Sequence, residues 1–179
     1  KIKEEIGDKE GIGKSLNNIG LIYRVLEDFD TALEYHQNSL RVNEEIANQS
    51  GVAKALNNIG LVYRGLKDYN WALESFQKAK RIYGELGDKE GISSSLNNLA
   101  LVYRALKSFD KALSLHHEAL QLSEEIDDNG GIAVSLNNIG YTHMDLNRYE
   151  KALPFFLRSL SLIEEIGDKY GEAEILVRL

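Results

Sequence analysis

The stretch SLNNIGLIYR, Ser15–Arg24, places two adjacent asparagines where the apolar spacing around them predicts a helix. Nearly the same ten residues return as ALNNIGLVYR from Ala55, SLNNLALVYR from Ser95 and SLNNIGYTHM from Ser135, each 40 residues after the last. Asparagine is a poor residue for the interior of a helix, because its amide competes for backbone hydrogen bonds. A fixed period of this length indicates stacked repeats without a single central core.

Each repeat opens with a helix, named helix A. In the first repeat its apolar face is formed by Ile12, Leu16, Ile19, Tyr23 and Leu26, at spacings of three and four. A residue whose side-chain oxygen can cap free backbone N–H groups precedes each helix A. These expected caps are Asp8, Asn48, Asp88, Asp128 and Asp168.

A second helix, helix B, follows a break at Glu27-Asp28, and its expected caps are Asp28, Asp68 and Ser108. Its apolar side is formed by Phe29, Ala32, Leu33, His36, Leu40 and Ile46. His36 and His116 stand where other repeats have Phe76 and Phe156, which favours packed core histidines over metal ligands. Helix B ends near Gly7, Gly87 and Gly167, residues suited to a left-handed terminus. Ala47 and Asp127 replace glycine in two repeats, so we expect those junctions to be less regular.

An antiparallel helix pair cannot bury its apolar faces alone, so we expect an all-α solenoid in which the pairs stack. The expected order in this single array is the end of a preceding helix B (1–7), four repeats (8–47, 48–87, 88–127 and 128–167), and the start of a further helix A (168–179). Such ends leave apolar faces uncovered. We therefore expect further repeats in a longer chain, or end-to-end self-association.

The repeated positions resemble the tetratricopeptide repeat, whose usual length is 34 residues. In the first repeat they are Leu16, Ile19, Gly20, Tyr23, Phe29, Ala32, His36 and Ser39. The usual turn glycine is replaced by Glu27, Lys67, Lys107 and Asn147. Long repeats with LNNIG look most like those of kinesin light chains, Pins-type scaffolds and bacterial signalling proteins. The resemblance implies a right-handed superhelix that serves as an interaction module, with helices A lining a concave groove.

On a helical wheel the asparagines lie on the side of helix A that faces away from helix B. An amide donates and accepts at once, so it suits the backbone of an extended peptide. Alternatively, Asn17 or Asn18 satisfies polar groups between adjacent helices A. The candidate peptide-binding residues are Lys14, Asn17, Asn18, Leu21, Arg24, Lys54, Asn57, Asn58, Leu61, Arg64, Asn97, Asn98, Leu101, Arg104, Asn137, Asn138, Tyr141 and Met144.

A stripe of arginine recurs on this surface, at Arg24, Arg64 and Arg104, within a chain of net charge −7. It predicts an acidic, extended protein or peptide ligand; the alternative is that each arginine pairs with a nearby carboxylate such as Glu27 or Asp28. In the fourth repeat Tyr141 and Met144 stand in the places of Leu21 and Arg24, which predicts a more apolar end of the groove.

Composition limits the other classes of function. The chain is 43% hydrophobic and 27% charged, with no cysteine and no apolar run approaching the ~18 residues of a membrane span. Its acidity disfavours nucleic acid and anionic lipid. We expect a cytoplasmic protein, no cofactor, no metal and no catalytic residue, and hence no enzyme. The alternative function is a structural or regulatory array making intramolecular or homo-oligomeric contacts for an attached effector domain.

Overall fold

The computed structural model describes residues 8–167, and this part of the chain contains eight α-helices and no strand. They are α2 (Lys9–Val25), α3 (Phe29–Glu45), α4 (Gln49–Gly65), α5 (Tyr69–Leu86), α6 (Lys89–Ala105), α7 (Phe109–Glu125), α8 (Asn129–Asp145) and α9 (Tyr149–Ile166). The segments predicted for 1–7 and 168–179 lie outside the described residues.

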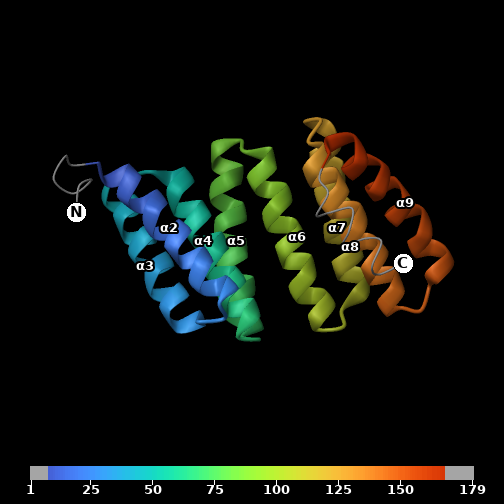
Figure 1. Ribbon diagram of the computed structural model, residues 1–179, viewed down its shortest axis with the longest axis horizontal. Coiled ribbons are helices and arrows are strands. Elements are labelled where there is room, and N and C mark those ends of the chain that lie inside the picture. The colour runs from blue at the N-terminus through green and yellow to red at the C-terminus, as the bar shows by residue number, and fades with distance from the viewer. Residues whose placement is uncertain (1–7, 168–179) are drawn as a thin grey trace. The chain divides into compact units, whose positions relative to one another are not determined.

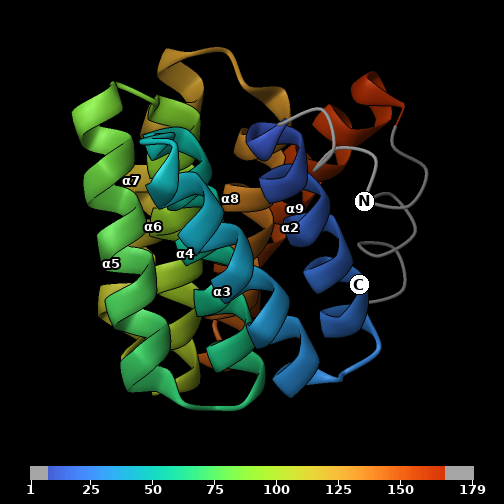
Figure 2. The same cartoon turned by 90° about the vertical axis from the view of Figure 1, so that its left-hand side faces the viewer.

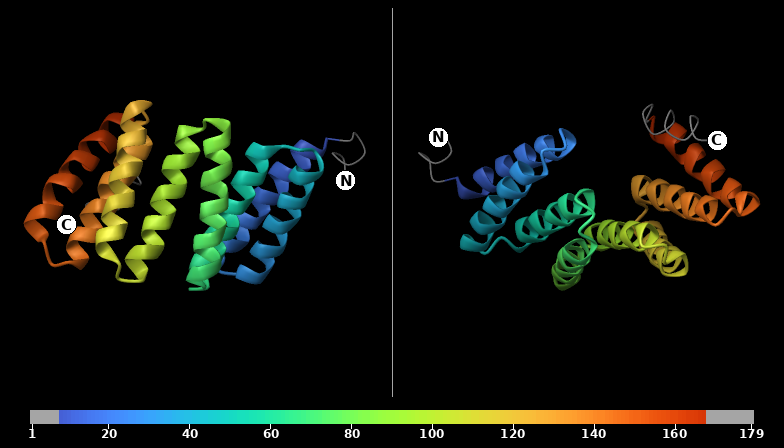
Figure 3. Two further views of the ribbon diagram at one scale, coloured as in Figure 1. Left: turned by 180° about the vertical axis from the view of Figure 1, so that it is seen from behind. Right: turned by 90° about the horizontal axis from the view of Figure 1, so that it is seen from below.

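Successive helices form antiparallel pairs, α2 with α3, α4 with α5, α6 with α7 and α8 with α9, joined by short turns (Figure 1). Each pair is helix A and helix B of one repeat, so the prediction of an all-α array of antiparallel helix pairs is confirmed. The chain divides after Asp88 into two compact units. In unit 1, whose helices run from blue to green in Figure 2, α4 packs on α3 and α2. In unit 2, α8 packs on α7 and α6, and α9 lies beside α8 (Figure 3).

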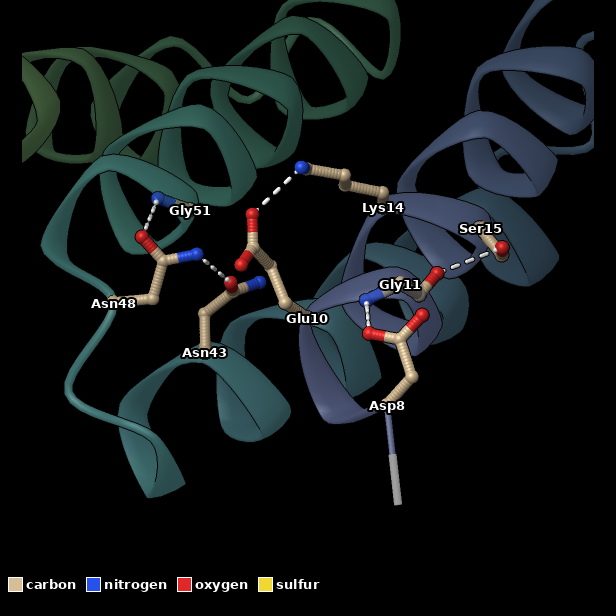
Figure 4. Close-up of polar contacts among 8 residues, drawn as sticks. All are labelled: Asp8, Glu10, Gly11, Lys14, Ser15, Asn43, Asn48 and Gly51. Atoms are coloured by element: carbon tan, nitrogen blue, oxygen red, sulfur yellow. Dashed lines mark hydrogen bonds and ion pairs between the residues drawn. The ribbon is translucent and has the colours of Figure 1, made fainter. Parts of the chain in front are cut away.

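Most predicted caps are present at the helix starts. The Asp8 carboxylate accepts a hydrogen bond from Gly11 N at 2.8 Å, and the Asn48 side chain accepts one from Gly51 N at 3.2 Å (Figure 4). Asp28 and Asp68 cap α3 and α5 in the same way. Asp128 and Ser108 occupy the cap positions of α8 and α7 without a side-chain hydrogen bond to the helix.

The helix ends use the left-handed conformation whether or not glycine is present. Helices A are followed by Glu27, Lys67, Lys107 and Asn147, with φ from 56° to 62°. After helices B, Ala47 and Asp127 both have φ of 54°, in register with Gly87 at 69° and Gly167 at 75°. The same closing bond forms without glycine, from Asn48 N to Asn43 O at 2.9 Å and from Asp128 N to Ser123 O at 2.9 Å. The junctions at Ala47 and Asp127 are therefore regular in conformation, contrary to the sequence-based expectation.

Within each repeat an aromatic ring of helix B packs against a small residue of helix A. A Cβ atom added to Gly20 would lie 2.7 Å from the His36 ring, and one added to Gly60 would lie 2.6 Å from the Phe76 ring. Both rings are fully buried, as is His116 opposite Ala100 in the third repeat. The prediction that these histidines pack in the core is confirmed. Small residues here let the two backbones approach closely.

Candidate peptide-binding surface

In unit 1, seven of the ten predicted residues of α2 and α4 line one pocket of about 450 Å³. It is formed by Lys14, Asn17, Asn18, Leu21, Lys54, Asn57, Asn58 and Tyr83. All of these except Tyr83 belong to the predicted set. Tyr83 comes from α5, a helix B, and is buried, so nothing in the pattern of helix A could have indicated it.

A second pocket, of about 370 Å³, lies in unit 2 between α6 and α8. Its lining includes the predicted residues Asn97, Asn98, Leu101 and Asn138. It also includes residues outside the predicted set, namely Glu90, Ser93, Ser94, Asp128, Gly130, Gly131 and Val134. Ser94 and Val134 stand at the repeat positions of Lys14 and Lys54. The 40-residue register could have revealed that this pocket has neither of the lysines that line the pocket of unit 1.

The first asparagine of the pair is used inside the protein in two repeats. Asn17 Oδ1 accepts hydrogen bonds from His36 Nδ1 at 2.9 Å and from Asn58 Nδ2 of the next helix A at 3.4 Å. Asn97, only 5% exposed, accepts from His116 Nδ1 at 2.6 Å and donates to Ser135 Oγ at 2.8 Å. At these two positions the alternative of a polar contact between adjacent helices A is what the structure contains.

In the other two repeats the helix B partner is phenylalanine, which offers no nitrogen to the asparagine. Asn137 is half-buried opposite Phe156, and its Oδ1 is shielded from solvent with no hydrogen-bond partner in the described part of the chain. Asn57 lines the pocket of unit 1.

The second asparagine of each pair lies at the pockets. Asn18 is exposed, and Asn58, Asn98 and Asn138 are half-buried. Of the repeated asparagines, these four are therefore the best placed to contact a ligand.

The two histidines that contact an asparagine, His36 and His116, are neutral at pH 7. Burial, and then the charge of Arg24, lower the pKa of His36 to about 4. Burial, and then the charges of Arg104 and His117, lower the pKa of His116 to about 3. Because an amide oxygen can only accept, each ring carries its hydrogen on Nδ1. The imidazoles thereby fix the orientation of Asn17 and Asn97.

The two lysines at the pocket of unit 1 differ in their partners. Lys14 Nζ lies 2.6 Å from Glu10 Oε1, four residues earlier on α2 (Figure 4). The hydrogen bond to Glu10, and then its charge, raise the pKa of Lys14. Lys54 makes no ion pair with any described residue, and Ser50 stands at the position of Glu10. The cationic character of this pocket therefore comes chiefly from Lys54.

The arginines of the stripe also differ. Arg104 Nε lies 2.5 Å from Asp145 Oδ2, and its guanidinium carbon lies 5.5 Å from the centre of the Tyr141 ring. Arg24 and Arg64 make no ion pair within residues 8–167, so the predicted alternative partners Glu27 and Asp28 do not engage them.

The predicted apolar end of the groove is largely built into the core. Tyr141 is 9% exposed, and its ring meets Phe156 edge-on at 5.1 Å between centroids. Met144 packs against the same cluster. Neither residue lines either pocket, nor do Arg24, Leu61, Arg64, Arg104 and Asn137.

Residues 8–167 contain no group of three or more histidine, aspartate or glutamate side chains arranged to hold a metal ion. Within the same range, no helix is both long and apolar enough to cross a membrane.

Comparison with known protein families matches the tetratricopeptide repeat to residues 11–85 and 91–165, which together span most of the chain. No curated protein matches the sequence.

Solved structures share the fold at low sequence identity. BtubC from P. vanneervenii is 18% identical with a TM-score of 0.73, over 89% of this chain and 66% of its own. Aspartyl phosphate phosphatase F from Bacillus subtilis is 16% identical with a TM-score of 0.82, over 91% and 43%. A Rap protein complexed with competence and sporulation factor is 18% identical with a TM-score of 0.78, over 87% and 44%. The chain thus spans less than two thirds of each of these proteins, and the likeness shows the fold alone.

Proposed function

Because the chain belongs to the tetratricopeptide repeat family, a family of protein-interaction scaffolds, we propose that it binds an extended, acidic protein segment on the surface formed by its helices A. The observation that carries this proposal is the pocket of unit 1, where residues from two successive helices A converge around asparagine amides and lysines. The proposal includes no catalytic step, no cofactor, and no binding of nucleic acid or membrane.

The contacts divide by chemistry. In unit 1, Asn18 and Asn58 hold the ligand backbone, because their amides can match both N–H and C=O groups whatever the ligand side chains are; Asn98 and Asn138 offer the same amides at the pocket of unit 2. Leu21 and Leu101 supply apolar surface beside them. Lys54 favours acidic side chains. Asn17 and Asn97 act indirectly, by holding adjacent helices in place.

One structural neighbour supports the use of this fold for binding. The Rap protein named above was solved in complex with competence and sporulation factor. The fold is therefore compatible with holding a separate factor, although the identity of 18% carries over no residue and no ligand to this chain.

The second candidate is an array that makes contacts with itself or with an attached effector domain. It is favoured by the outer face of α2, where Ile22, Val25 and Leu26 are 61%, 73% and 68% exposed. At the equivalent place on α4, Val62 is fully buried. A chain whose apolar face associates with a copy would show a concentration-dependent mass in sedimentation experiments.

The proposed function is tested with an array of octapeptides that share one apolar pattern and differ in net charge. We expect the purified chain to bind the acidic members, more weakly as salt rises, because exposed charges are screened over ~10 Å at 0.1 M. Asn18→Ala combined with Asn58→Ala should weaken every bound peptide by about fivefold per lost hydrogen bond, equivalent to about 1 kcal/mol each.

Asn70→Ala is the matched control, because Asn70 is exposed on α5, away from the pocket. Helicity and melting temperature should be the same in all variants. Failure of every peptide to bind, or equal binding by the double variant and the wild type, would remove this surface as the ligand site.

A further inference from the structure

The three arginines of the stripe occupy one repeat position, but the partner of each is set by the following helix A. Arg104 of α6 reaches Asp145 at the end of α8, with 2.5 Å between Nε and Oδ2, and lies over the ring of Tyr141. A carboxylate and an aromatic face of the same unit therefore satisfy this guanidinium. Of the four helices A, only α8 carries an acid at the position of Asp145.

Arg24 of α2 has no such partner. The residues of α4 in register with Tyr141 and Asp145 are Leu61 and Gly65, which offer neither charge nor ring. Arg24 Nε is shielded from solvent and has no hydrogen-bond partner within the described residues. A buried N–H group without an acceptor is costly, and more so on a charged group.

Arg64 stands on α4 at the same repeat position as Arg24. It is half-buried, and no ion pair or hydrogen bond to its side chain forms within residues 8–167. Burial, and then the charge of Arg24, lower the pKa of Arg64. Arg24 and Arg64 stand at the same repeat position of two packed helices, α2 and α4, and no carboxylate of the described chain forms an ion pair with either.

We propose that Arg24 and Arg64 together form a seat for an oxyanion, and that Arg104 takes no part in it. Guanidinium groups match carboxylate and phosphate oxygens with paired N–H donors, and an anion near both would offset their mutual repulsion. This inference rests on the proposed function for the source of the anion, an acidic side chain of the bound segment. It adds the place where acidic residues bind, which is unit 1.

The rest of the helix A surface has the same asymmetry. Lys14 and Lys54 line the pocket of unit 1, whereas Glu90 and Asp128 line the pocket of unit 2. An acidic residue is therefore favoured at unit 1 and disfavoured at unit 2. Exposed charges of this kind steer a ligand more than they hold it.

The test compares a labelled octapeptide of alternating glutamate and alanine with its glutamine counterpart. Arg24→Gln combined with Arg64→Gln should weaken binding of the glutamate peptide by at least about tenfold, since charged hydrogen bonds are lost. Binding of the glutamine peptide should be unchanged. Arg104→Gln is the matched control, and we expect less than about a twofold effect, because Asp145 already compensates Arg104.

A second experiment uses a variant that we expect to gain affinity. Asp145→Gly copies Gly65 onto the exposed end of α8 and releases Arg104 from its ion pair. We expect this variant to bind the glutamate peptide about threefold to tenfold more tightly than the wild type does. An unchanged affinity, with Arg24→Gln/Arg64→Gln also unchanged, would overturn the seat.

Inorganic phosphate tests the seat without any peptide. At constant ionic strength set with chloride, phosphate should raise the melting temperature of the wild type and of Arg104→Gln, and not that of Arg24→Gln/Arg64→Gln. Equal shifts in all three would refute the seat. Tighter binding of a phosphoserine peptide than of the glutamate peptide would support the seat and assign the anion to phosphate.

The two proposals fail separately. If peptides bind and depend on Asn18 and Asn58 but ignore both arginines, the seat is refuted and the proposed function stands. If no peptide binds but phosphate stabilises the wild type through Arg24 and Arg64, the seat stands and the proposed function is refuted.

Discussion

Repeats one and three differ from repeats two and four at one buried position of helix B. The odd repeats carry His36 and His116, and the even repeats carry Phe76 and Phe156. In the odd repeats the ring donates a hydrogen bond to the first asparagine of helix A, at 2.9 Å and 2.6 Å. In the even repeats the phenylalanine ring is apolar and cannot donate this hydrogen bond. The same alternation occurs where helix B ends, with Ala47 and Asp127 against Gly87 and Gly167.

The two asparagines of the repeated sequence LNN therefore have different structural roles. The first asparagine belongs to the interior wherever a histidine faces it, because a buried imidazole N–H needs an acceptor. The second asparagine lies at the pockets in every repeat, whatever helix B carries. The first asparagines therefore differ in their surroundings from repeat to repeat, whereas the second asparagines lie at a pocket in all four repeats.

Removing the first asparagine should separate the two kinds of repeat most strongly. Asn97→Ala leaves the His116 N–H without its acceptor inside the core, so we expect a loss of about 2–3 kcal/mol in the free energy of unfolding. Asn137→Ala should cost less than about 1 kcal/mol, because Asn137 Oδ1 has no partner in the described chain. Urea denaturation of the two variants measures the difference. Equal losses would show that the asparagines are equivalent after all.

Acidification should act on the odd repeats. The folded pKa of His36, about 4, is below the ordinary value of 6.5, so between these values the unfolded chain binds a proton that the folded chain does not. Stability is therefore lost as the pH falls below 6.5. His36→Phe should reduce the loss between pH 7 and pH 5 by about 2 kcal/mol.

Phenylalanine fits this site by precedent, because Phe76 packs against Gly60 as His36 packs against Gly20. Melting the wild type and the His36→Phe variant over this pH range provides the measurement. Parallel pH profiles would mean that His36 gains a proton without cost in the folded protein.

The smallest effect should come from the helix B ends. Ala47→Gly relieves a left-handed alanine and should raise the free energy of unfolding by about 0.5–1 kcal/mol. Gly87→Ala should lower it by a similar amount through the backbone alone, because a Cβ on Gly87 would meet no atom within 4 Å. Changes of the same sign in both variants, measured by thermal unfolding, would contradict this account.

The fold could be predicted from the sequence because the same pattern recurs in four repeats. An unusual residue in one repeat therefore does not change the helix assignment. Apolar spacing, caps such as Asp8 and Asn48, and the 40-residue register predicted the helix pairs. The wheel also grouped Lys14, Asn18, Lys54 and Asn58, which line one pocket. The contribution of Tyr83 was not predictable, because it comes from helix B and depends on how α5 packs.

What the sequence alone determined is periodic and local: where helices start and stop, which face of each is apolar, and which small residues let the backbones meet. Only the tertiary structure decided which polar group faces which. The pairing of Asn97 with His116 and Ser135, and that of Arg104 with Asp145, join residues 19 to 41 positions apart. A hydrogen bond forms or fails within a few tenths of an ångström. Periodicity places a side chain on a face of its helix, but packing decides whether a partner lies within that distance.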